Sequence, residues 1–451
     1  MPTGRVSFNE KLFWTGIVLI VYLVMRLIPL WGVGQTGSQD PFLPIRVVLG
    51  GQRGGLLELG IGPIVTGGLI LQLLIGAGII SYDSSNPNDR AMLTSASKFL
   101  ALLMTLVSAI AFVLGGAYGQ LTPVVGVLVV VQLLSAGVLL VLMDELLQKG
   151  WGLGSGISLF ILAGVAQAIF WDAFSPVPAG TTLRGSIFAY FQDIFHGNSP
   201  LTSFYSRPSS LPTMLGLATT IAILIVVIYL EGVSIQLPIA HARYRGFSGK
   251  YPIKLLYVSN IPVILASALF ADIYLVANVI NGQPAIASSI IGQFVGKFNG
   301  SQPISGLVYY VTPPRTLDAI AIDPLHALIY LAILILLCIA FSVTWLTVSG
   351  MDANSVATQL VDSGVLVPGF RRATQPISAL LSKYIPTVTV LGGFLVGLIA
   401  AMGDFLGVYG SGTGILLSVG IIYQYYEIIM RERIAELHPG LERILGGKGA
   451  R

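Results

Sequence analysis

Residues 151–159 of the chain read WGLGSGISL, and residues 409–417 read YGSGTGILL. In both stretches glycine alternates with other residues and then gives way to a long apolar run. A second pair of stretches shows the same kind of likeness, since residues 60–65 read GIGPIV and residues 259–264 read SNIPVI. Each of these places a proline near the start of an apolar run, followed by branched residues. The two parts of the chain therefore carry an internal repeat.

The composition around these motifs is that of a membrane protein. The chain has 451 residues, of which 54% are hydrophobic and 10% are charged, and its mean hydropathy is +0.84. Soluble domains carry about 25% charged residues, so this composition excludes a soluble enzyme and a disordered chain. The single cysteine, Cys338, excludes an internal disulfide and leaves no cysteine-based metal site. We expect a polytopic membrane protein.

Apolar runs long enough to cross a bilayer recur along the whole chain. A membrane helix needs roughly 20 apolar residues, and ten such runs occur, the second matching the seventh and the fifth matching the tenth. Two successive halves with an odd number of spans run in opposite directions through the membrane, so the repeat is inverted. The first run is too long for a removable signal peptide and lacks its cleavage site. The runs are approximately 12–31, 61–80, 93–114, 121–143, 155–172, 212–230, 255–277, 325–349, 378–402 and 408–430.

The basic residues orient these spans. Cytoplasmic loops retain an excess of Lys and Arg. With the N-terminus inside, all but seven of the 24 basic residues fall inside or at the inner helix ends. The reverse orientation inverts this bias, so we predict that both termini are cytoplasmic. The exceptions are Arg26, Arg46, Arg53, Arg184, Arg207, Lys297 and Arg315.

The spans divide the chain into two halves joined by an external loop. The loops rich in Ser, Pro, Gly and Asn fall outside, and the long internal loops are basic at their tips. The units are residues 1–172 with spans one to five, the external loop 173–211, and residues 212–451 with spans six to ten and internal loops at about 231–254 and 350–377.

Residues 41–60 fit neither a span nor an ordinary loop. They are half apolar, but four glycines interrupt them and they include Arg46, Arg53 and Glu58. Irregular backbone at membrane depth is tolerated only where it lines a cavity or is buried in protein. The pattern fits a re-entrant element and, equally well, an ordinary external loop.

The spans carry few of the residues that catalysis or ion coupling needs. Ion-driven transporters place ionisable residues inside their spans, whereas the charged residues here lie near predicted helix ends, where their heads reach the interface at little cost. The sequence has no Walker-type phosphate loop and no paired-histidine metal motif. We expect neither an enzyme nor a cofactor, and an ion-coupled secondary transporter with five-plus-five inverted repeats is the alternative. The charged residues concerned are Arg26, Lys98, Glu231, Asp272 and Asp404.

The matched spans offer bulky aliphatic residues instead. Ile61 and Val65 are four residues apart, as are Ile157 and Ile161, so each pair shares one helix face. An isolated isoleucine in a span is most often a lipid or packing contact. A ring of such residues, however, seals a pore, because a narrow hydrophobic constriction excludes water and ions by dewetting.

Five ordered motifs resemble the SecY-type protein-conducting channel, the central subunit of the Sec translocon. The resemblance covers nearly the whole chain, and the amino-acid sequence of the third motif is similar to that of the archaeal and eukaryotic branch of the family. The motifs are residues 59–74 (LGIGPIVTGGLILQLL), 144–161 (DELLQKGWGLGSGISLFI), 251–265 (YPIKLLYVSNIPVIL), 351–360 (MDANSVATQL) and 409–427.

The resemblance implies an all-α membrane protein with ten transmembrane helices in two inverted five-helix halves, hinged like a clamshell around a central pore. The family's plug, a re-entrant half-helix that blocks the pore from outside, favours the re-entrant interpretation of residues 41–60. It matches Ile45, Arg46, Val47, Val48, Leu49, Gly50, Gly51, Gln52, Arg53, Gly54 and Gly55. The family's pore ring matches Ile61, Val65, Ile157, Ile161, Ile264 and Leu417, with Leu416 as the alternative to Leu417.

The resemblance also implies a lateral gate between spans two and three on one side and spans seven and eight on the other. In the family a polar cluster at this gate helps to set the opening threshold. Thr66, Ser108 and Asn260 match its members. Ser108 stands where the family often has glutamine, and its shorter side chain implies weaker hydrogen bonding in the closed gate.

The implied function is passage of unfolded secretory polypeptides through the pore, with release of hydrophobic segments into lipid through the gate. The expected partners are small single-span subunits of SecE type and beta type, the ribosome, nascent chains with signal sequences, and membrane lipids. The expected location is the plasma membrane of an archaeon rather than the endoplasmic reticulum. Basic residues on the two internal loops favour a polyanion such as ribosomal RNA, although the positive-inside rule alone also accounts for them. They are Arg243, Arg245, Lys250, Arg371 and Arg372.

Overall fold

Helices form most of the described part of the chain. Within that part, nine helices are long and apolar enough to cross a membrane, and a shorter apolar helix covers Gly62–Gly76. The computed structural model describes residues 6–33, 51, 54–80, 82, 86–116, 118–119, 121–179, 182–197, 199–205, 207, 211–241, 248–258, 261–281, 287, 289–299, 302–362, 365–366 and 374–437. The apolar helices are α1 (Phe8–Leu27), α3 (Gly62–Gly76), α4 (Pro87–Leu114), α5 (Pro123–Leu146), α6 (Gly156–Phe174), α9 (Met214–Gly232), α10 (Ile261–Asn281), α15 (Pro324–Val348), α17 (Thr374–Phe405) and α18 (Gly412–Leu437).

These helices match the ten predicted apolar runs, although several ends are shifted by four residues or more. Helix α10 begins at Ile261 rather than 255, because residues 255–258 form a turn after a strand. Helix α3 ends at Gly76 rather than 80, and Gly78 follows with a φ of +71°, which is a common way to end a helix. At 1.5 Å per residue α3 is about 22 Å long, shorter than the ~30 Å of hydrocarbon that a full span crosses.

Caps and prolines in the sequence set many of the helix starts. The side chains of Ser7, Asn86, Thr213 and Asp323 each accept a hydrogen bond from a backbone N–H in the first turn of the helix that follows. Such caps satisfy donors that have no partner inside the helix. Pro63 stands in the first turn of α3, where its missing N–H costs nothing.

The loops hold secondary structure that the sequence analysis did not predict. The loop before α9 contains a strand pair and two helices, and the segment before α15 contains another strand pair with three short helices. Between α9 and α10, β3 pairs with β4 in antiparallel register from Ser234–Lys254 to Ala240–Ser248, and β3 also pairs with β7. The elements are η1 (Leu147–Trp151), β1 (Pro178–Ala179), β2 (Thr182–Leu183), α7 (Ser186–Phe195), α8 (Pro200–Tyr205), β3 (Ser234–His241), β4 (Ser248–Lys254), α12 (Ile290–Val295), β5 (Lys297–Asn299), β6 (Gln302–Ser305), α13 (Leu307–Tyr310), α14 (Leu317–Ile322), α16 (Ala353–Asp362) and β7 (Val365–Leu366).

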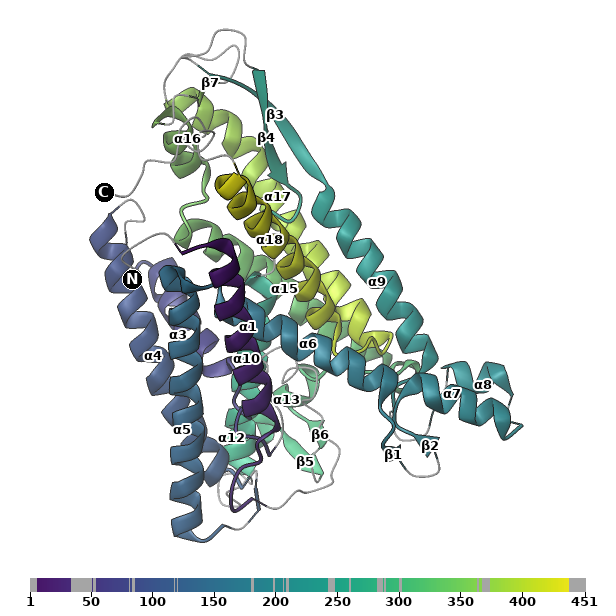
Figure 1. The fold of residues 1–451 in the computed structure, drawn as a ribbon. Coiled ribbons are helices and arrows are strands. Elements are labelled where there is room, and N and C mark those ends of the chain that lie inside the picture. The colour runs from purple at the N-terminus through teal and green to yellow at the C-terminus, as the bar shows by residue number, and fades with distance from the viewer. Residues whose placement is uncertain are drawn as a thin grey trace.

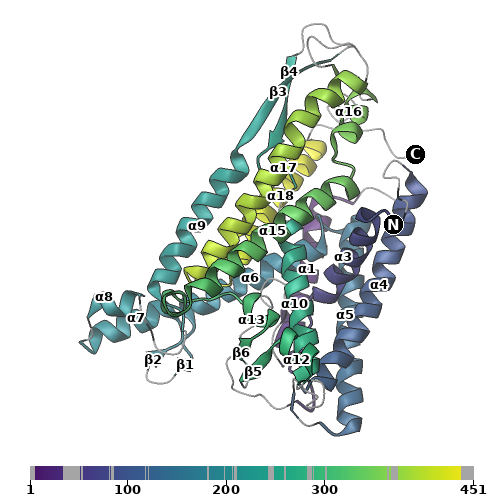
Figure 2. The ribbon, with the colours of Figure 1, turned by 180° about the vertical axis from the view of Figure 1, so that it is seen from behind.

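The two ends of the helix bundle carry different loops. The β3–β4 hairpin and α16 lie at the same end as the start of α1 and the end of α18 (Figure 1). The opposite end carries α7, α8, α12 and the strand pairs β1–β2 and β5–β6, as the reverse view confirms (Figure 2). This grouping is the one that the predicted topology requires, with internal loops on one side and external loops on the other.

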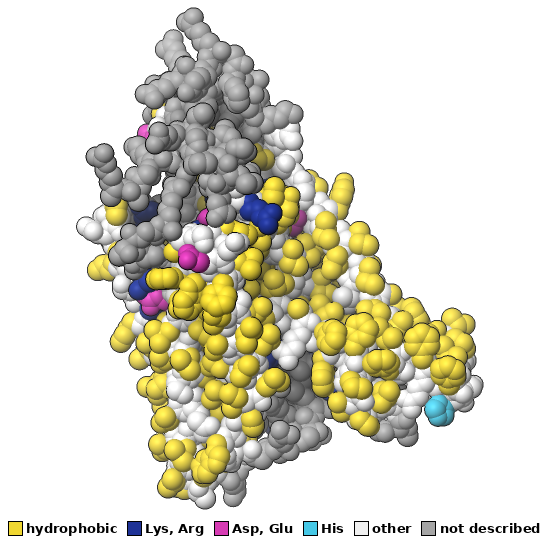
Figure 3. Space-filling model, viewed as in Figure 1, with side chains coloured by type: hydrophobic (Ala, Val, Ile, Leu, Met, Phe, Trp, Pro, Cys, Tyr) yellow, Lys and Arg dark blue, Asp and Glu magenta, His cyan; other side chains and the backbone are white. Residues whose placement is uncertain are grey.

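The apolar surface follows the sides of the bundle. Figure 3 shows hydrophobic side chains over α4, α5 and α6 to α8, while the visible charged side chains gather near the end that carries the β3–β4 hairpin. Exposed apolar side chains such as those of Val124, Val131 and Ile225 are expected where a helix faces lipid. A large buried apolar cluster lies inside, with members from α1, α3, α6, α10, α15, α17 and α18.

Candidate functional site

The predicted ring residues come together in the large buried cluster. They come from four helices, α3, α6, α10 and α18, which belong to both halves of the sequence repeat. Ile61, Ile161, Leu416 and Leu417 are at most 1% exposed, while Val65, Ile157 and Ile264 are partly buried against the same cluster. All seven side chains therefore belong to one contiguous apolar core, although up to 356 positions separate them in the sequence.

Every ring position lies at or near the start of its helix. Ile61 is the N-cap of α3, and Ile264 is in the first turn of α10. Ile161 and Leu417 are each five residues beyond the first residue of their helices, Gly156 and Gly412. The point at which each helix begins therefore decides which side chains reach the cluster.

Glycine geometry explains the repeated motif at two of these starts. Gly154 has a φ of +68° and Gly410 a φ of +79°, a left-handed conformation that glycine adopts without a steric penalty. Each lies two residues before its helix, α6 or α18. Gly154 is therefore structurally equivalent to Gly410. This pairing differs by two positions from the one obtained by aligning the amino-acid sequences of the two motifs.

Polar side chains meet where α3 faces α10. Thr66 Oγ1 lies 3.0 Å from Asp272 Oδ2 and 3.2 Å from Asp272 Oδ1, and it donates to this carboxylate. Thr66 and Ser108 are both buried. Helix α3 also contacts α15, and α4 contacts α10. Asn260, the third predicted member of this polar cluster, lies outside the described residues.

The sequence analysis placed Asp272 wrongly, near a helix end. Because α10 runs from Ile261 to Asn281, Asp272 lies near its middle and bonds across to another helix. An ionisable residue inside a membrane helix is a signal of function, and a later helix end would have revealed it.

The expectation that charged residues reach the interface is wrong at three further positions. Arg26, Glu231 and Asp404 are at most 7% exposed. Lys98 does lie at the surface, where its Nζ is 3.0 Å from Glu145 Oε1. Polar partners inside the protein, rather than access to water, therefore accommodate Arg26 and Asp404.

The described part of the predicted plug is held at its carboxyl end. Arg26 Nη2 donates to the carbonyl of Gly51 at 3.4 Å, and the Gly54 N–H donates to Glu58 Oε2 at 2.9 Å. Gly55 forms an isolated bridge with Pro29 after α1. Ile45, Arg46, Val47, Val48, Leu49, Gly50, Gln52 and Arg53 lie outside the described residues.

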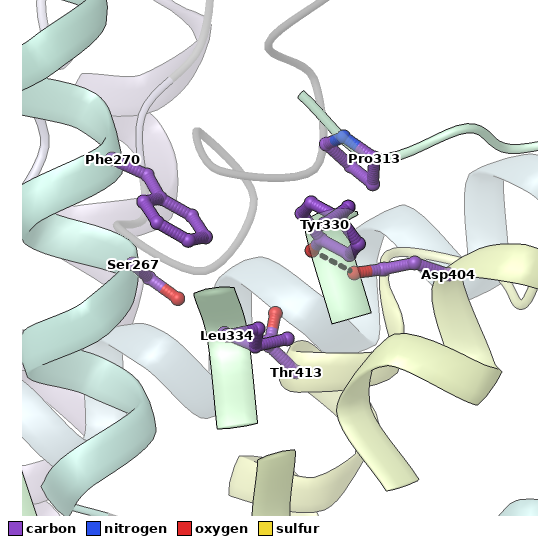
Figure 4. A pocket seen from close by; sticks show the side chains of 7 residues that line it. All are labelled: Ser267, Phe270, Pro313, Tyr330, Leu334, Asp404 and Thr413. Carbon is purple, nitrogen blue, oxygen red and sulfur yellow. Dashed lines mark hydrogen bonds between the residues drawn. The ribbon is translucent and has the colours of Figure 1, made fainter. Parts of the chain in front are cut away.

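A small pocket lies beside the start of α18. Ser267 and Phe270 reach it from α10, Tyr330 and Leu334 from α15, and Asp404 from α17, with Pro313 and Thr413 completing the lining (Figure 4). Tyr330 donates a hydrogen bond of 2.9 Å to Asp404 Oδ2. The pocket offers a buried acid already bonded to a phenol, which is a structural arrangement rather than a pair poised for proton transfer.

The predicted ribosome-docking residues are mostly outside the described part. Arg243, Arg245, Arg371 and Arg372 lie outside it, and Lys250 is described only as a backbone position in β4, paired with Pro238. Among the described residues, no group of three His, Cys, Asp or Glu side chains is arranged to hold a metal ion.

Known proteins with the same sequence pattern and fold identify the chain. The SecY family matches residues 55–426, and the plug domain of Sec61p matches residues 20–54. The protein translocase subunit SecY of Pyrococcus furiosus is 41% identical over 464 aligned positions, which cover 99% of this chain and 96% of that protein.

Two solved structures share the fold over nearly the whole length. A structure described as that of a protein conducting channel matches with a TM-score of 0.84 and 38% identity, covering 98% of this chain and 96% of that chain. Sec61 in the canine ribosome-channel complex from the endoplasmic reticulum matches with a TM-score of 0.82, the same identity and the same coverage. The chain belongs to the SecY family.

Proposed function

We propose that the chain forms the protein-conducting pore of a Sec translocase. Unfolded secretory polypeptides cross the membrane through this pore, and hydrophobic segments leave it sideways into lipid. The observation that carries the proposal is that aliphatic residues from four helices of both halves, at the positions of the repeated motifs, belong to one buried apolar core. As a relative of translocase subunits and channels, the chain is a channel subunit and not an enzyme.

The ring of Ile61, Val65, Ile157, Ile161, Ile264 and Leu417 is the proposed seal. A narrow aliphatic constriction excludes ions because water does not wet it. Such a ring makes no fixed polar bonds, so it widens around an extended polypeptide and closes again afterwards. The low exposure of Ile61, Ile161 and Leu417 supports a sealed state.

The helix starts favour Leu417 over Leu416 as the sixth ring member. Gly156 and Gly412 each begin a helix behind a glycine of positive φ. Counting from these two glycines, Leu417 is the equivalent of Ile161. Leu416 corresponds to Phe160, which stacks on Tyr22 of α1 at 4.7 Å between ring centroids and so serves packing.

The lateral gate is the proposed exit for hydrophobic segments. A signal sequence that moves from a polar pore to lipid gains roughly 25 cal/mol for each Å² of apolar surface that leaves water. A gate that opens transiently between α3 and α10 lets each segment sample both environments. Segments are then sorted by hydrophobicity, and hydrophilic ones continue through the pore. Thr66 and Asp272 hold this gate closed, with Ser108 and Asn260 as further polar members.

The plug is proposed to be residues 45–55, as the plug-domain match to residues 20–54 supports. Its described carboxyl end is tied to α1 and to the segment before α3 by Arg26 and Glu58.

The proposed partners and location follow from the relatives. One structural neighbour is a ribosome-channel complex, so we propose the ribosome as partner, docked on the loops with Arg243, Arg245, Lys250, Arg371 and Arg372. Small SecE-type and beta-type subunits, nascent chains with signal sequences and lipids complete the set. The chain is a multi-pass membrane protein with an archaeal relative, which supports an archaeal plasma membrane with both termini cytoplasmic.

The alternative of an ion-coupled transporter finds no support among the relatives. That class needs polar ligands at broken helices near the midplane. Here the four helix starts carry aliphatic side chains, and the acid nearby, Asp272, is bonded to Thr66.

Crosslinking in reconstituted vesicles tests the function. A cysteine replaces Ile61 in a Cys338→Ala background, and a stalled secretory chain carries a cysteine probe. The matched control is Ile20→Cys on the outer face of α1, where Ile20 is 61% exposed. We expect a crosslink from position 61 and none from position 20. The absence of a crosslink together with uptake of small solutes would overturn the channel in favour of a transporter.

The same assay distinguishes the two leucines. Leu417→Cys is expected to crosslink to the stalled chain, and its neighbour Leu416→Cys is not. The reverse pattern would mean that Leu416, and not Leu417, is the sixth member of the ring.

A further inference from the structure

Two aspartates lie in the last turns of the helices that precede α6 and α18, the two matched helices of the repeat. Asp144 lies in the last turn of α5, directly before the turn that leads to α6, and Asp404 lies in the last turn of α17, before α18. Each is an acid on the helix that precedes a ring-bearing helix. Neither takes part in the passage of a polypeptide described above.

Asp144 caps the start of α6 from the preceding helix. Its Oδ1 accepts a hydrogen bond of 3.1 Å from the Ile157 N–H and one of 3.4 Å from Ser155 Oγ, while its Oδ2 accepts one from Gln148. The residue at the N-cap, Ser155, makes no side-chain cap of its own. The carboxylate therefore satisfies a first-turn donor that α6 cannot satisfy itself.

Asp404 bonds to the start of α18, where Ser411 Oγ also accepts a hydrogen bond of 2.8 Å from the Gly414 N–H. Asp404 Oδ1 accepts a hydrogen bond of 2.9 Å from the Gly412 N–H, and its Oδ2 accepts the Tyr330 hydroxyl. Its side chain is buried, since the residue is only 3% exposed. At both helix starts a negative carboxylate faces the positive end of the helix dipole.

Glycine lets each helix start approach its aspartate. A Cβ atom on Gly156 would lie 2.8 Å from the Cα of Asp144, and one on Gly412 would lie 2.9 Å from the backbone nitrogen of Asp404. Both distances are too short for a side chain. At each helix start, the aspartate thus accepts a hydrogen bond from a backbone N–H, and the glycine lets the backbone approach to bonding distance.

These starts carry the proposed ring residues. Ile157 follows Gly156 directly and is itself bonded through its N–H to Asp144. Ile161 and Leu417 are five residues beyond their glycines. A shift of either start rotates or displaces the ring side chains, because successive positions on a helix point about 100° apart.

We propose that Asp144 and Asp404 are positioning residues of the pore seal, which they set by fixing the starts of α6 and α18. This inference rests on the proposed function, because it requires Ile157, Ile161 and Leu417 to belong to the seal. Asp144 fixes one half of the ring and Asp404 the other.

Ion conductance of the idle channel tests the inference. The complex with its partner subunits is reconstituted in planar bilayers, and each aspartate is replaced by leucine, which has no acceptor, or by asparagine, which keeps an acceptor oxygen. We expect Asp144→Leu and Asp404→Leu to raise the idle conductance about tenfold, the shift that loss of one hydrogen bond to a charged group produces. Asp144→Asn and Asp404→Asn are expected to stay within about twofold of the parent, since they retain the acceptor.

Two controls separate the possible failures. Tyr330→Phe removes the second bond of Asp404 and leaves the bond to Gly412, so it is expected to stay sealed. Ile61→Asn breaks the ring directly and is expected to leak. If Ile61→Asn conducts ions while the leucine variants at both aspartates stay sealed, the inference is overturned and the ring is retained. If Ile61→Asn itself stays sealed, the ring is refuted.

Folding is monitored separately. Asp404 is deeply buried, so Asp404→Leu is compared only if the purified complex elutes as the parent does. Asp144 is less buried, and its leucine variant provides the decisive measurement if Asp404→Leu fails to assemble. A leak of the asparagine variants equal to that of the leucine variants would also contradict the inference, because a lost acceptor would then not be the cause.

Discussion

The contact between α15 and α17 and the contact between α3 and α10 join helices in different ways. On α17, a Cβ atom at Gly393 would lie 3.0 Å from the carbonyl oxygen of Cys338, and one at Gly397 would lie 2.9 Å from the Cα of Ile335. The backbones of α15 and α17 thus touch. Between α3 and α10, by contrast, the bond that joins them runs between two side chains, Thr66 and Asp272.

The difference separates a permanent contact from one that can open. Where glycine lies at the contact, the backbones of two helices pack directly against each other. Helices packed in this way stay together in a membrane. The same device joins α3 to α4, where a Cβ atom at Gly67 would lie 2.7 Å from the nitrogen of Ala101. Glycine therefore brings α15 to α17 and α3 to α4 backbone against backbone, while the hydrogen bond between α3 and α10 joins side chains that can part and meet again.

The largest expected effect comes from breaking the permanent contact. Gly397→Leu forces a branched side chain into the backbone of α15 and is expected to cost about 3 kcal/mol or more of stability. Gly16→Leu on α1 is the control, because nothing lies within 4 Å of the Cβ position there. Thermal unfolding of the two purified variants measures the difference. Equal melting temperatures would contradict the assignment of α15–α17 as a permanent contact.

Weakening the opening contact should change gating before stability. Thr66→Val removes the donor to Asp272 and leaves a partly buried acid without its bond, which costs about 1–3 kcal/mol in the closed state. We expect the variant to transport substrates with defective signal sequences that the parent rejects. Thr389→Val is the matched control, since that buried hydroxyl bonds only to Ile385 of its own helix. If Thr66→Val rejects the defective substrates as the parent does, the pair does not hold the gate.

A third contact lies outside both interfaces, in the turn between α17 and α18. Tyr409 is buried, donates to the Thr213 carbonyl at 2.7 Å and also contacts the Ser186 hydroxyl. We expect Tyr409→Phe to lower stability by about 1 kcal/mol without altering gating. Chemical denaturation near neutral pH measures this loss, and altered selection of signal sequences would contradict a purely structural role.

The same tyrosine predicts a pH dependence. Burial raises the pKa of Tyr409 from 10.0 to about 12. The unfolded chain therefore loses this proton first, so the contribution of the neutral phenol is complete below pH 10 and declines as the pH rises toward 12. The stability difference between parent and Tyr409→Phe should shrink over this range. A constant difference from pH 9 to 12 would show that the phenol does not titrate as described.

The smallest effect is expected at the surface of the second half. Lys254 Nζ lies 3.0 Å from Glu427 Oε1, with side chains 36% and 45% exposed. Exposed ion pairs contribute about 0–1 kcal/mol, so Lys254→Gln should leave unfolding nearly unchanged. A loss above about 2 kcal/mol would contradict the description of this contact as an exposed pair of small effect.

The sequence was sufficient for the spans because hydropathy is a local property. Ten apolar runs and two repeated motifs predicted the helices and their inverted order. The start of α10 was missed because Leu255 and Leu256 are apolar yet lie in the turn after β4, and hydropathy cannot distinguish an apolar turn from an apolar helix. The short strands were missed because paired strands depend on a partner elsewhere in the chain.

The polar contacts were harder to predict than the apolar ring. Ile61 with Val65 and Ile157 with Ile161 share spacing and chemistry, so the sequence alone indicated them, whereas Ile264 and Leu417 were predicted from the family resemblance. Asp272 pairs with Thr66 from 206 positions away, and Asp404 acts on a helix start that glycine geometry defines. Such pairs depend on tertiary packing, and a single sequence carries no direct signal for them.

The most direct test of a gate between α3 and α10 is a covalent bridge across it. Thr66→Cys and Asp272→Cys are combined in a Cys338→Ala background and joined by oxidation or a short thiol reagent. The control pair, Val113→Cys with Gly126→Cys, lies between α4 and α5 of one half, where the Cβ of residue 126 would lie 3.2 Å from Val113 Cγ1. We predict that bridging Thr66→Cys to Asp272→Cys blocks release of hydrophobic segments into lipid, that reduction of the disulfide restores it, and that the bridged control stays active. Full release through the bridged channel would contradict the account.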